Sequence, residues 1–574
     1  MVEVVDMRFP RVRVRVRSDA DADEVADLLP GAAPGAWVMA PLPAAVAGLH
    51  LLDAYLPVNP AAEAVIRRLV AACVARISGL DHGNKDEWED RLDALLKTRC
   101  LEREAVDAYF DKHVFDLADP VRPFLQHPAL AAECSKPAAP GKLHFDRAAG
   151  NNAVWWDHTP QDTPMDLDTA FEGIMLWRGY GPCGTGAQRD HGGTNTKSMK
   201  AGPYRSLVSY FPECRDLFLS ALLSCPPPWT WPSGPGQDTA PWEEDGPADP
   251  MAPAVPAGPI GLLTARAAHH ILVNVTDNQV SECWVAWGTL TDLPVVRDPF
   301  VLDREKGGPM RGSHRRGLLR DFDALIAATD PSVKAPAGVH RPAWIDVYAQ
   351  LSRDQLEAIG PVRVRAVGYD QDKREMGDSI AYTATTPETL AACLPAREPR
   401  RARIVAIGRQ DCEHAEQHLL SQLRSAWRKI DPGAKVIPWE EQAQTVFWDR
   451  SDDLFWNAVR TVTDPATELA AMTLTVYDEV TADIATSIAG FLPVAEHRKW
   501  LRIGLALRDG RVPRPSPAAE PRRNPHDHHH ARDRPGARRL VHARCPQGLL
   551  HSRRTVRSAT GPEHRPGRPG TPHG

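Results

Sequence analysis

The sequence predicts an α+β fold: a large mixed N-terminal domain with irregular sheets and long loops at residues 1–400, a C-terminal four-helix bundle at 401–510, and a disordered tail at 511–574. Three observations lead to this prediction. Strand-like alternations and helical periodicities are interspersed before residue 400. Four helical patterns with short proline-containing connectors follow. The last segment is rich in Arg, Pro, His and Gly and has too few large apolar residues for a core.

The composition indicates a soluble, cytoplasmic protein. Of its 574 residues, 43% are hydrophobic and 25% are charged, which is ordinary for a globular chain. No stretch approaches the roughly 18 apolar residues of a membrane-spanning helix. Charges recur through residues 7–17, where a secretory signal would be apolar. The cysteines include no C-x-x-C pair, which disfavours zinc ribbons and a disulfide framework.

The net charge of −6 is unevenly distributed. From Arg511 onward 14 basic residues face 4 acidic ones, so the tail carries about +10 and the rest of the chain about −16. An acidic body disfavours free-standing, non-specific DNA binding. Local contact with nucleic acid remains open if partner proteins neutralise most of the phosphates.

The N-terminal elements follow from their periodicities. Residues 11–17 alternate Arg and Val, which predicts an edge strand with a solvated arginine face or, as an alternative, a strand facing RNA. Helices are predicted at 64–77 and 88–96, and a proline-bounded connector at 120–128.

A glycine segment, Gly179–Gly186 (GYGPCGTG), contains the spacing G-x-G-x-x-G. A dinucleotide site needs this spacing between a strand and a helix. Here a helical pattern at 167–175 precedes it, and the polar residues 187–196 that follow have no apolar face. Pro182 also removes a backbone donor. The order is therefore helix, glycine loop, polar loop, which excludes a dinucleotide fold.

The rest of the chain is assigned in the same way. Residues 226–260 are predicted to be a long loop, and strands are predicted at 270–275, 281–287 and 363–369, the last leading into a polar hairpin tip at 370–377. Helices are predicted at 403–428, 441–462, 468–492 and 495–507, with breaks at Pro432, Pro438, Pro465 and Pro493.

No constellation of residues indicates catalysis. The sequence has no G-x-S-x-G, G-K-[ST] or H-E-x-x-H motif. His414 and His418 are four residues apart, which leaves a metal-dependent hydrolase as a weak alternative to surface histidines. Asp166 and Asp168 are best explained as charges or caps at a helix start. No catalytic residue, metal or cofactor is therefore predicted.

Features that suit binding are clearer. A glycine loop lets a partner's backbone approach closely, as in a DNA minor groove. Lys197, Lys200 and Arg205 could pair with phosphates or be ordinary surface charges. Trp155 and Trp156 could stack on a base or pack in the core.

Several segments, in order, match motifs of one known family. They are Val4–Pro10 (VVDMRFP), Pro123–Gln126 (PFLQ), Asn151–His158 (NNAVWWDH), Gly179–Gly186, Lys200–Arg205 (KAGPYR), Pro241–Gly246 (PWEEDG) and Gly368–Asp372 (GYDQD). Together with the C-terminal helices, this set covers roughly residues 1–507. It resembles the large subunit, the CasA family, of the type I-E CRISPR Cascade effector complex, in an actinobacterial-type form.

The resemblance implies a non-catalytic subunit of a crRNA-guided antiviral ribonucleoprotein. Such a subunit recognises a protospacer-adjacent motif (PAM) in duplex DNA from the minor groove, helps to open the duplex for R-loop formation, and recruits the helicase–nuclease. Its partners would be crRNA, the other Cascade subunits, the PAM-containing DNA and the helicase–nuclease.

The resemblance also assigns site residues. The PAM contacts would be the glycine-loop residues Gly181, Gly184 and Gly186, the wedge residue Gln371 with Asp372 and Lys373, and the cations Lys200 and Arg297. Contacts to the crRNA handle or a neighbouring subunit would be Trp155, Trp156, Asp157 and His158. The family's lysine finger has no lysine at its expected place, where Arg297 or Lys306 would substitute. This gap and an out-of-frame appearance of the tail leave a decayed family member as an alternative.

Overall fold

The computed structural model describes residues 9–145, 160–230, 236–253, 255–293, 296–304, 308–313, 317–327, 338–371 and 380–508. The predicted tail and the candidate residues at 155–158, 372 and 373 lie outside this part of the chain. Residues Met1–Pro513 form one compact unit. No helix in the described part combines the length and the apolar character needed to cross a membrane.

The first sheet is antiparallel with the strand order β2-β1-β3. Its strands are β1 (Arg11–Val16), β2 (Trp37–Pro41) and β3 (Leu52–Tyr55). The valines of β1 are buried, while Arg11 bonds to Asp168 and Arg15 bonds to Asp53. The alternation therefore predicted a strand correctly. The expectation of an edge strand is wrong, because β2 and β3 pair with both sides of β1.

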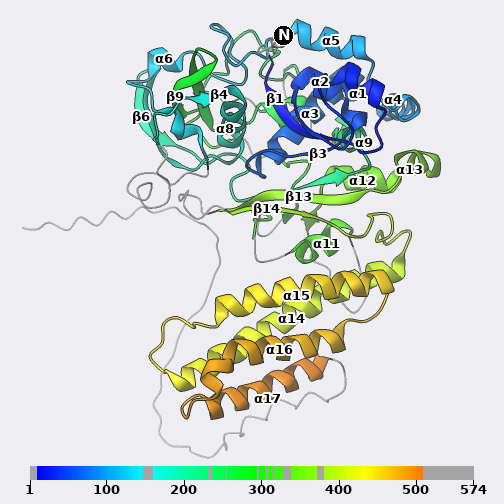
Figure 1. Ribbon diagram of the computed structural model, residues 1–574, viewed down its shortest axis with the longest axis vertical. Coiled ribbons are helices and arrows are strands. Elements are labelled where there is room, and N and C mark those ends of the chain that lie inside the picture. Colours follow the sequence, from blue (N-terminus) through cyan, green and yellow to red (C-terminus); the bar gives the residue numbers. More distant parts are fainter. Residues whose placement is uncertain are drawn as a thin grey trace, which may run out of the picture. The chain divides into compact units, whose positions relative to one another are not determined.

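Five helices belong to this part of the described chain (Figure 1). They are α1 (Ala22–Leu28), α2 (Leu42–Ala47), α3 (Ala62–Ser78), α4 (Lys85–Thr98) and α5 (Arg103–Lys112). Helix α2 contacts β1 and β2, α3 and α5 pack on α2 and on each other, and α4 packs on α13 (Arg353–Ile359). The predicted helices at 64–77 and 88–96 are confirmed as α3 and α4. Helix α3 was expected to be apolar on one face, but it is buried along most of its length, including the charged residues Glu63, Arg67 and Arg68.

Two further antiparallel sheets follow, with the orders β4-β9-β8 and β14-β13-β7. Their strands are β4 (Met165–Asp166), β7 (Val208–Glu213), β8 (His269–Thr276), β9 (Gln279–Trp287), β13 (Arg363–Asp370) and β14 (Ile380–Thr385). A separate hairpin joins β5 (Gly184–His191) to β6 (Thr194–Met199), and β10 (Asp303–Arg304), β11 (Gly308–Pro309) and β12 (Val339–His340) form a small sheet. The strands predicted at 270–275, 281–287 and 363–369 are confirmed.

Other helices lie between these strands along the chain. They are α6 (Leu130–Glu133), α8 (Leu167–Tyr180), α9 (Leu217–Leu223), α10 (Pro259–Thr264), α11 (Leu319–Leu325), α12 (Ala343–Gln350) and α13 (Arg353–Ile359). The mixture of short sheets and helices confirms the predicted α+β class.

Four helices make up the C-terminal region, shown in yellow to orange in Figure 1. They are α14 (Pro399–Ile430), α15 (Glu440–Thr461), α16 (Ala466–Ala485) and α17 (Phe491–Arg508). Helix α14 contacts the other three. Pro493 was expected to separate two helices, but it lies in the first turn of α17, where a missing backbone N–H costs no hydrogen bond. The division into two domains at residue 400 stays a prediction.

Candidate nucleic-acid interface

Helix α8 leads directly into the glycine segment. The Asp166 side chain caps its start by accepting from the backbone N–H of Thr169 at 2.8 Å, as the capping interpretation expected. The helix ends at Tyr180, and Gly181 is its C-cap. The glycine segment therefore runs from the end of a helix into the start of strand β5, the reverse of the order in a dinucleotide site.

The three glycines predicted to face DNA have different surroundings. A Cβ on Gly181 would lie 2.5 Å from Cε1 of His269, and one on Gly186 would lie 2.5 Å from Sδ of Met199. Gly184 has a φ of +150°, and a Cβ there would meet no described atom within 4 Å. Gly184 is thus the exposed glycine, whereas the absence of a side chain at Gly181 and Gly186 permits close packing.

The polar segment after the glycines forms a β-hairpin, which corrects the expectation of a loop. Strands β5 and β6 are antiparallel, and Gly192 and Gly193 between them have φ values of +58° and +80°. These angles suit a tight two-residue turn. The Gly-Gly pair was a usable sequence signal. The hairpin was not predicted, because its strands are polar and a strand was expected only where apolar residues alternate with polar ones.

Arg189 anchors this hairpin. Its guanidinium bonds Glu133 at 2.7 Å and the carbonyl oxygen of Trp287 at 2.6 Å, and it lies 4.7 Å from the centre of the Trp287 ring. Most other side chains of the hairpin are exposed or half-buried. One buried cation on β5 therefore fixes a polar hairpin against β9.

The chain after β6 returns along the glycine segment. The N–H of Gly202 donates to the carbonyl oxygen of Gly181 at 2.8 Å, and the N–H of Tyr204 donates to that of Gly179 at 2.9 Å. Arg205 donates to the carbonyl oxygen of Tyr180 at 3.0 Å and is buried. Arg205 therefore supports the glycine segment from inside the protein, rather than standing at the surface like Lys197.

The fold brings Gly184 and Lys200 together. Gly184 pairs with Met199 in the hairpin register, so Lys200 is the next residue beyond that pair. The Nζ of Lys200 lies 2.8 Å from Oδ1 of Asp292, and both side chains are exposed, at 46% and 91%. The exposed backbone of Gly184 thus lies one register position from the backbone of an exposed lysine.

Gln371 is connected to the same segment. It follows β13 and is 8% exposed. Its carbonyl oxygen accepts from the hydroxyl of Ser206 at 2.6 Å, and its Oε1 lies 3.4 Å from the backbone nitrogen of Ser206. Its sequence neighbours Asp372 and Lys373 lie outside the described residues, as do Trp155, Trp156, Asp157 and His158.

Arg297 is exposed and lies elsewhere in the structure. With Lys85, Trp88 and Trp229 it lines a cavity of about 610 Å³ whose walls do not include the glycine segment. The chain segment 199–206 therefore connects Gly184, Lys200 and Gln371, because Met199 pairs with Gly184 and Ser206 bonds to Gln371. Arg297 lies apart from this segment.

A histidine that sequence analysis did not assign holds the glycine segment. Nε2–H of His269 donates to the carbonyl oxygen of Pro182 at 3.0 Å. Burial lowers the pKa of His269 to about 4, so the ring is neutral at pH 7. In this neutral ring the proton is on Nε2, which donates to the backbone of the glycine segment.

No group of three or more His, Cys, Asp or Glu side chains in the described part of the chain could hold a metal ion. His414 and His418 share a face of α14, as their spacing predicted, and their rings stack at 4.4 Å.

Comparisons with known proteins identify similar chains. Residues 55–486 match the family model described as CRISPR-associated protein Cse1. A chain of a solved "CRISPR RNA-guided surveillance complex" is 29% identical, with 86% of this chain and 99% of that chain covered and a TM-score of 0.72. Thermus thermophilus CasA (Cse1) is 17% identical, with 87% and 99% covered and a TM-score of 0.65. Thermobifida fusca Cse1 is 15% identical, with 88% and 98% covered and a TM-score of 0.66. No curated protein sequence matches the chain.

Proposed function

The chain belongs to the Cse1 (CasA) family, the large subunits of type I-E CRISPR surveillance complexes, and we propose that it recognises a PAM in duplex DNA within such a complex. In this role it assembles with crRNA and the other Cascade subunits and has no catalytic residue. It approaches the minor groove, helps to open the duplex for R-loop formation and recruits the helicase–nuclease. Sequence choice beyond the PAM is left to base pairing with the guide.

The observation that carries this proposal is the pairing of Gly184 with Met199 next to Lys200. A backbone without a side chain can follow the floor of a minor groove, where bases present few distinguishing groups. Lys200 is available for a phosphate, because an exposed ion pair such as that with Asp292 contributes only about 0–1 kcal/mol. DNA phosphate can therefore replace Asp292 at little cost.

Gln371 supplies the strand-separating step in this proposal. It is the residue before the 372–379 segment, between two paired antiparallel strands. To reach DNA its side chain exchanges the contact with Ser206 for one with a base. Gln371→Ala is therefore expected to weaken strand opening more than initial PAM contact. Equal loss of both in a footprinting assay would contradict the role.

Reconstitution with the other Cascade proteins and crRNA tests the function. Binding to matched duplexes with and without a PAM is measured over a range of salt concentrations. Lys200→Gln should reduce the salt slope of log K by about one unit without abolishing guide pairing. Gly184→Asp should weaken binding, because it places a carboxylate beside phosphates.

Lys97→Gln is the matched control, since Lys97 is an exposed lysine on α4. The proposal fails if PAM-dependent binding persists without this chain. A complex that assembles normally but shows no PAM preference would instead indicate a decayed family member, the second candidate, which the missing lysine finger favours.

A further inference from the structure

A second site lies away from the glycine segment. A cavity of about 150 Å³ is lined by the connector 121–128, the end of α8, the loop 241–253 and the segment that leads into β8. This lies below the roughly 300–1,000 Å³ of pockets that hold drug-sized ligands. This is too small for a nucleotide but sufficient for a group of a few heavy atoms.

Arg178 is one of three arginines on the wall of this cavity, with Arg122 and Arg266. Its guanidinium donates to the carbonyl oxygens of Thr264 at 2.9 Å and Leu125 at 3.4 Å. Within the described residues, no carboxylate forms an ion pair with it. Burial lowers the pKa of Arg178 to about 10, which leaves it charged at pH 7. The C-terminal dipole of α8 offsets part of this charge, but a buried cation normally also has an anionic partner.

Two histidines on the cavity wall are neutral hydrogen-bonding groups. The rings of His127 and His270 stack at 4.4 Å. Burial lowers the pKa of His127 to about 4 and that of His270 well below its usual value. Arg189 donates to Nδ1 of His270 at 3.1 Å, so the proton of that ring is on Nε2, a donor. His127 is 5% exposed, and its Nδ1 has no hydrogen-bond partner in the described part of the chain.

Acidic groups on the cavity wall lie at its rim. Glu244 and Asp249 are exposed. Glu244 accepts from the hydroxyl of Thr239 at 2.7 Å, and Asp249 accepts from the backbone N–H of Met251 at 2.8 Å. Both carboxylates accept hydrogen bonds from neighbouring groups, and the three arginines of the wall outnumber them.

Apolar side chains form a further part of the wall. Phe124, Ile271 and Trp242 line it, together with several prolines. Trp242 donates from Nε1 to the hydroxyl of Tyr109 at 2.9 Å.

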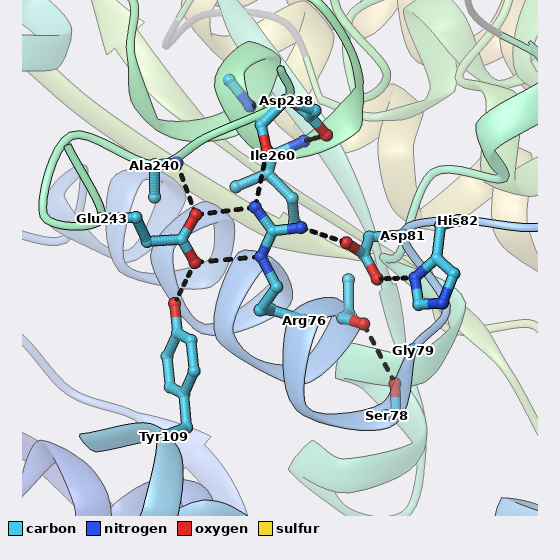
Figure 2. A network of polar contacts seen from close by, with 12 residues as sticks. Arg76, Ser78, Gly79, Asp81, His82, Tyr109, Asp238, Ala240, Glu243 and Ile260 are labelled. Atoms are coloured by element: carbon cyan, nitrogen blue, oxygen red, sulfur yellow. Dashed lines mark hydrogen bonds and ion pairs between the residues drawn. The ribbon is translucent and has the colours of Figure 1, made fainter. Parts of the chain in front are cut away.

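A polar network holds the adjacent residue, Glu243. Figure 2 shows Glu243 bonded to Arg76 and to Tyr109. The Arg76–Glu243 contacts are 2.9 and 2.6 Å. The cavity wall is therefore held in place before any ligand enters, which lowers the entropy cost of binding.

We propose that this cavity binds a compact carboxylate that carries a small apolar group. The planar guanidinium of Arg178 matches a carboxylate in shape and charge, and the apolar wall accepts the hydrocarbon part. The carboxylate comes either from a free small acid or from the C-terminus of a peptide.

Calorimetric titration of the whole chain tests this site. Isobutyrate should bind with a dissociation constant of about 1 mM, and its neutral isostere isobutyramide should not bind. Acetyl-Ala-Val with a free C-terminus should bind, whereas the amidated form should not. Tighter binding of the dipeptide than of isobutyrate identifies a peptide C-terminus as the source. The opposite order identifies a free acid.

Arg178→Met should weaken isobutyrate binding at least about tenfold. Arg401→Met is the matched control, because Arg401 also bonds two backbone carbonyls, of Val459 and Ala392, but lines none of these cavities. If Arg178→Met does not fold, Ala267→Leu, which fills the cavity, should abolish binding instead. Three ligand results would overturn the proposal: neither carboxylate binds, isobutyramide binds as well as isobutyrate, or phosphate binds more tightly. Unchanged isobutyrate binding in Arg178→Met or in Ala267→Leu would also overturn it.

Discussion

Individual glycines in the segment 179–186 have separate roles. Gly181→Ala should lower the thermal midpoint, because its Cβ would lie 2.5 Å from the His269 ring and such overpacking costs about 1–3 kcal/mol. Gly184→Ala meets no described atom within 4 Å, but its φ of +150° strains any residue with a Cβ, which costs about 1–3 kcal/mol. Scanning calorimetry of both variants measures the two losses. An unchanged midpoint in Gly181→Ala would contradict its packing role.

His269 makes stability depend on pH. Its pKa is lowered from 6.5 to about 4 by burial, so between these values the unfolded chain binds a proton that the folded chain does not. Stability therefore falls as the pH falls from 6.5 to 4, by at most about 3 kcal/mol from this residue. His269→Gln can still donate to Pro182 but does not titrate. Its thermal midpoint should fall less over this pH range, and an unchanged pH profile would show that His269 does not contribute.

At the scale of elements, Arg76 connects helix α3 to the loop that contains Glu243 (Figure 2). Removing it leaves the buried carboxylates of Glu243 and Asp81 without their cation. Arg76→Met should therefore destabilise the protein by about 2–4 kcal/mol. Arg76→Lys should recover part of this loss, because it keeps the charge but not the two-point contact.

The same substitution should expose the loop around Glu243 to proteases. Limited proteolysis of wild type, Arg76→Met and Arg76→Lys measures this directly. Equal cleavage rates in the three proteins would mean that other contacts hold the loop.

At the scale of the whole molecule, the described core lies within one unit that ends at Pro513. A chain that ends at this residue should therefore keep its cooperative unfolding, with a thermal midpoint within about 2 °C of the full chain, because it keeps every described core residue. Calorimetry of the two chains checks this. A lower midpoint for the shorter chain would show that residues 514–574 stabilise the folded unit.

The helical C-terminal region is joined to α11 by specific contacts. Arg409 on α14 bonds Asp323 at 2.6 Å, and the ring of Phe322 lies 5.0 Å from that of Trp456. Burial raises the pKa of Asp323 to about 6. None of these pairings could be predicted, because each joins residues far apart in sequence whose local patterns are independent.

Local periodicity predicted some elements of this fold and failed to predict others. The apolar repeats of α3 and α8 and the alternation in β8 and β13 were enough to predict them, because local periodicity determines which face can be buried. The β5–β6 hairpin was missed, since its strands carry almost no apolar residues. The edge position predicted for β1 was wrong because pairing partners are set by tertiary contacts.

By itself, the sequence determined the α+β class, most element positions, the family resemblance and the exclusion of a dinucleotide site. Only the tertiary structure decided which glycine is exposed, that Lys200 lies beside it, and that Arg205 is buried. It also revealed the cavity that contains Arg178. The physical reason is that periodicity is a local property, whereas exposure and charge compensation depend on groups brought together from distant parts of the chain.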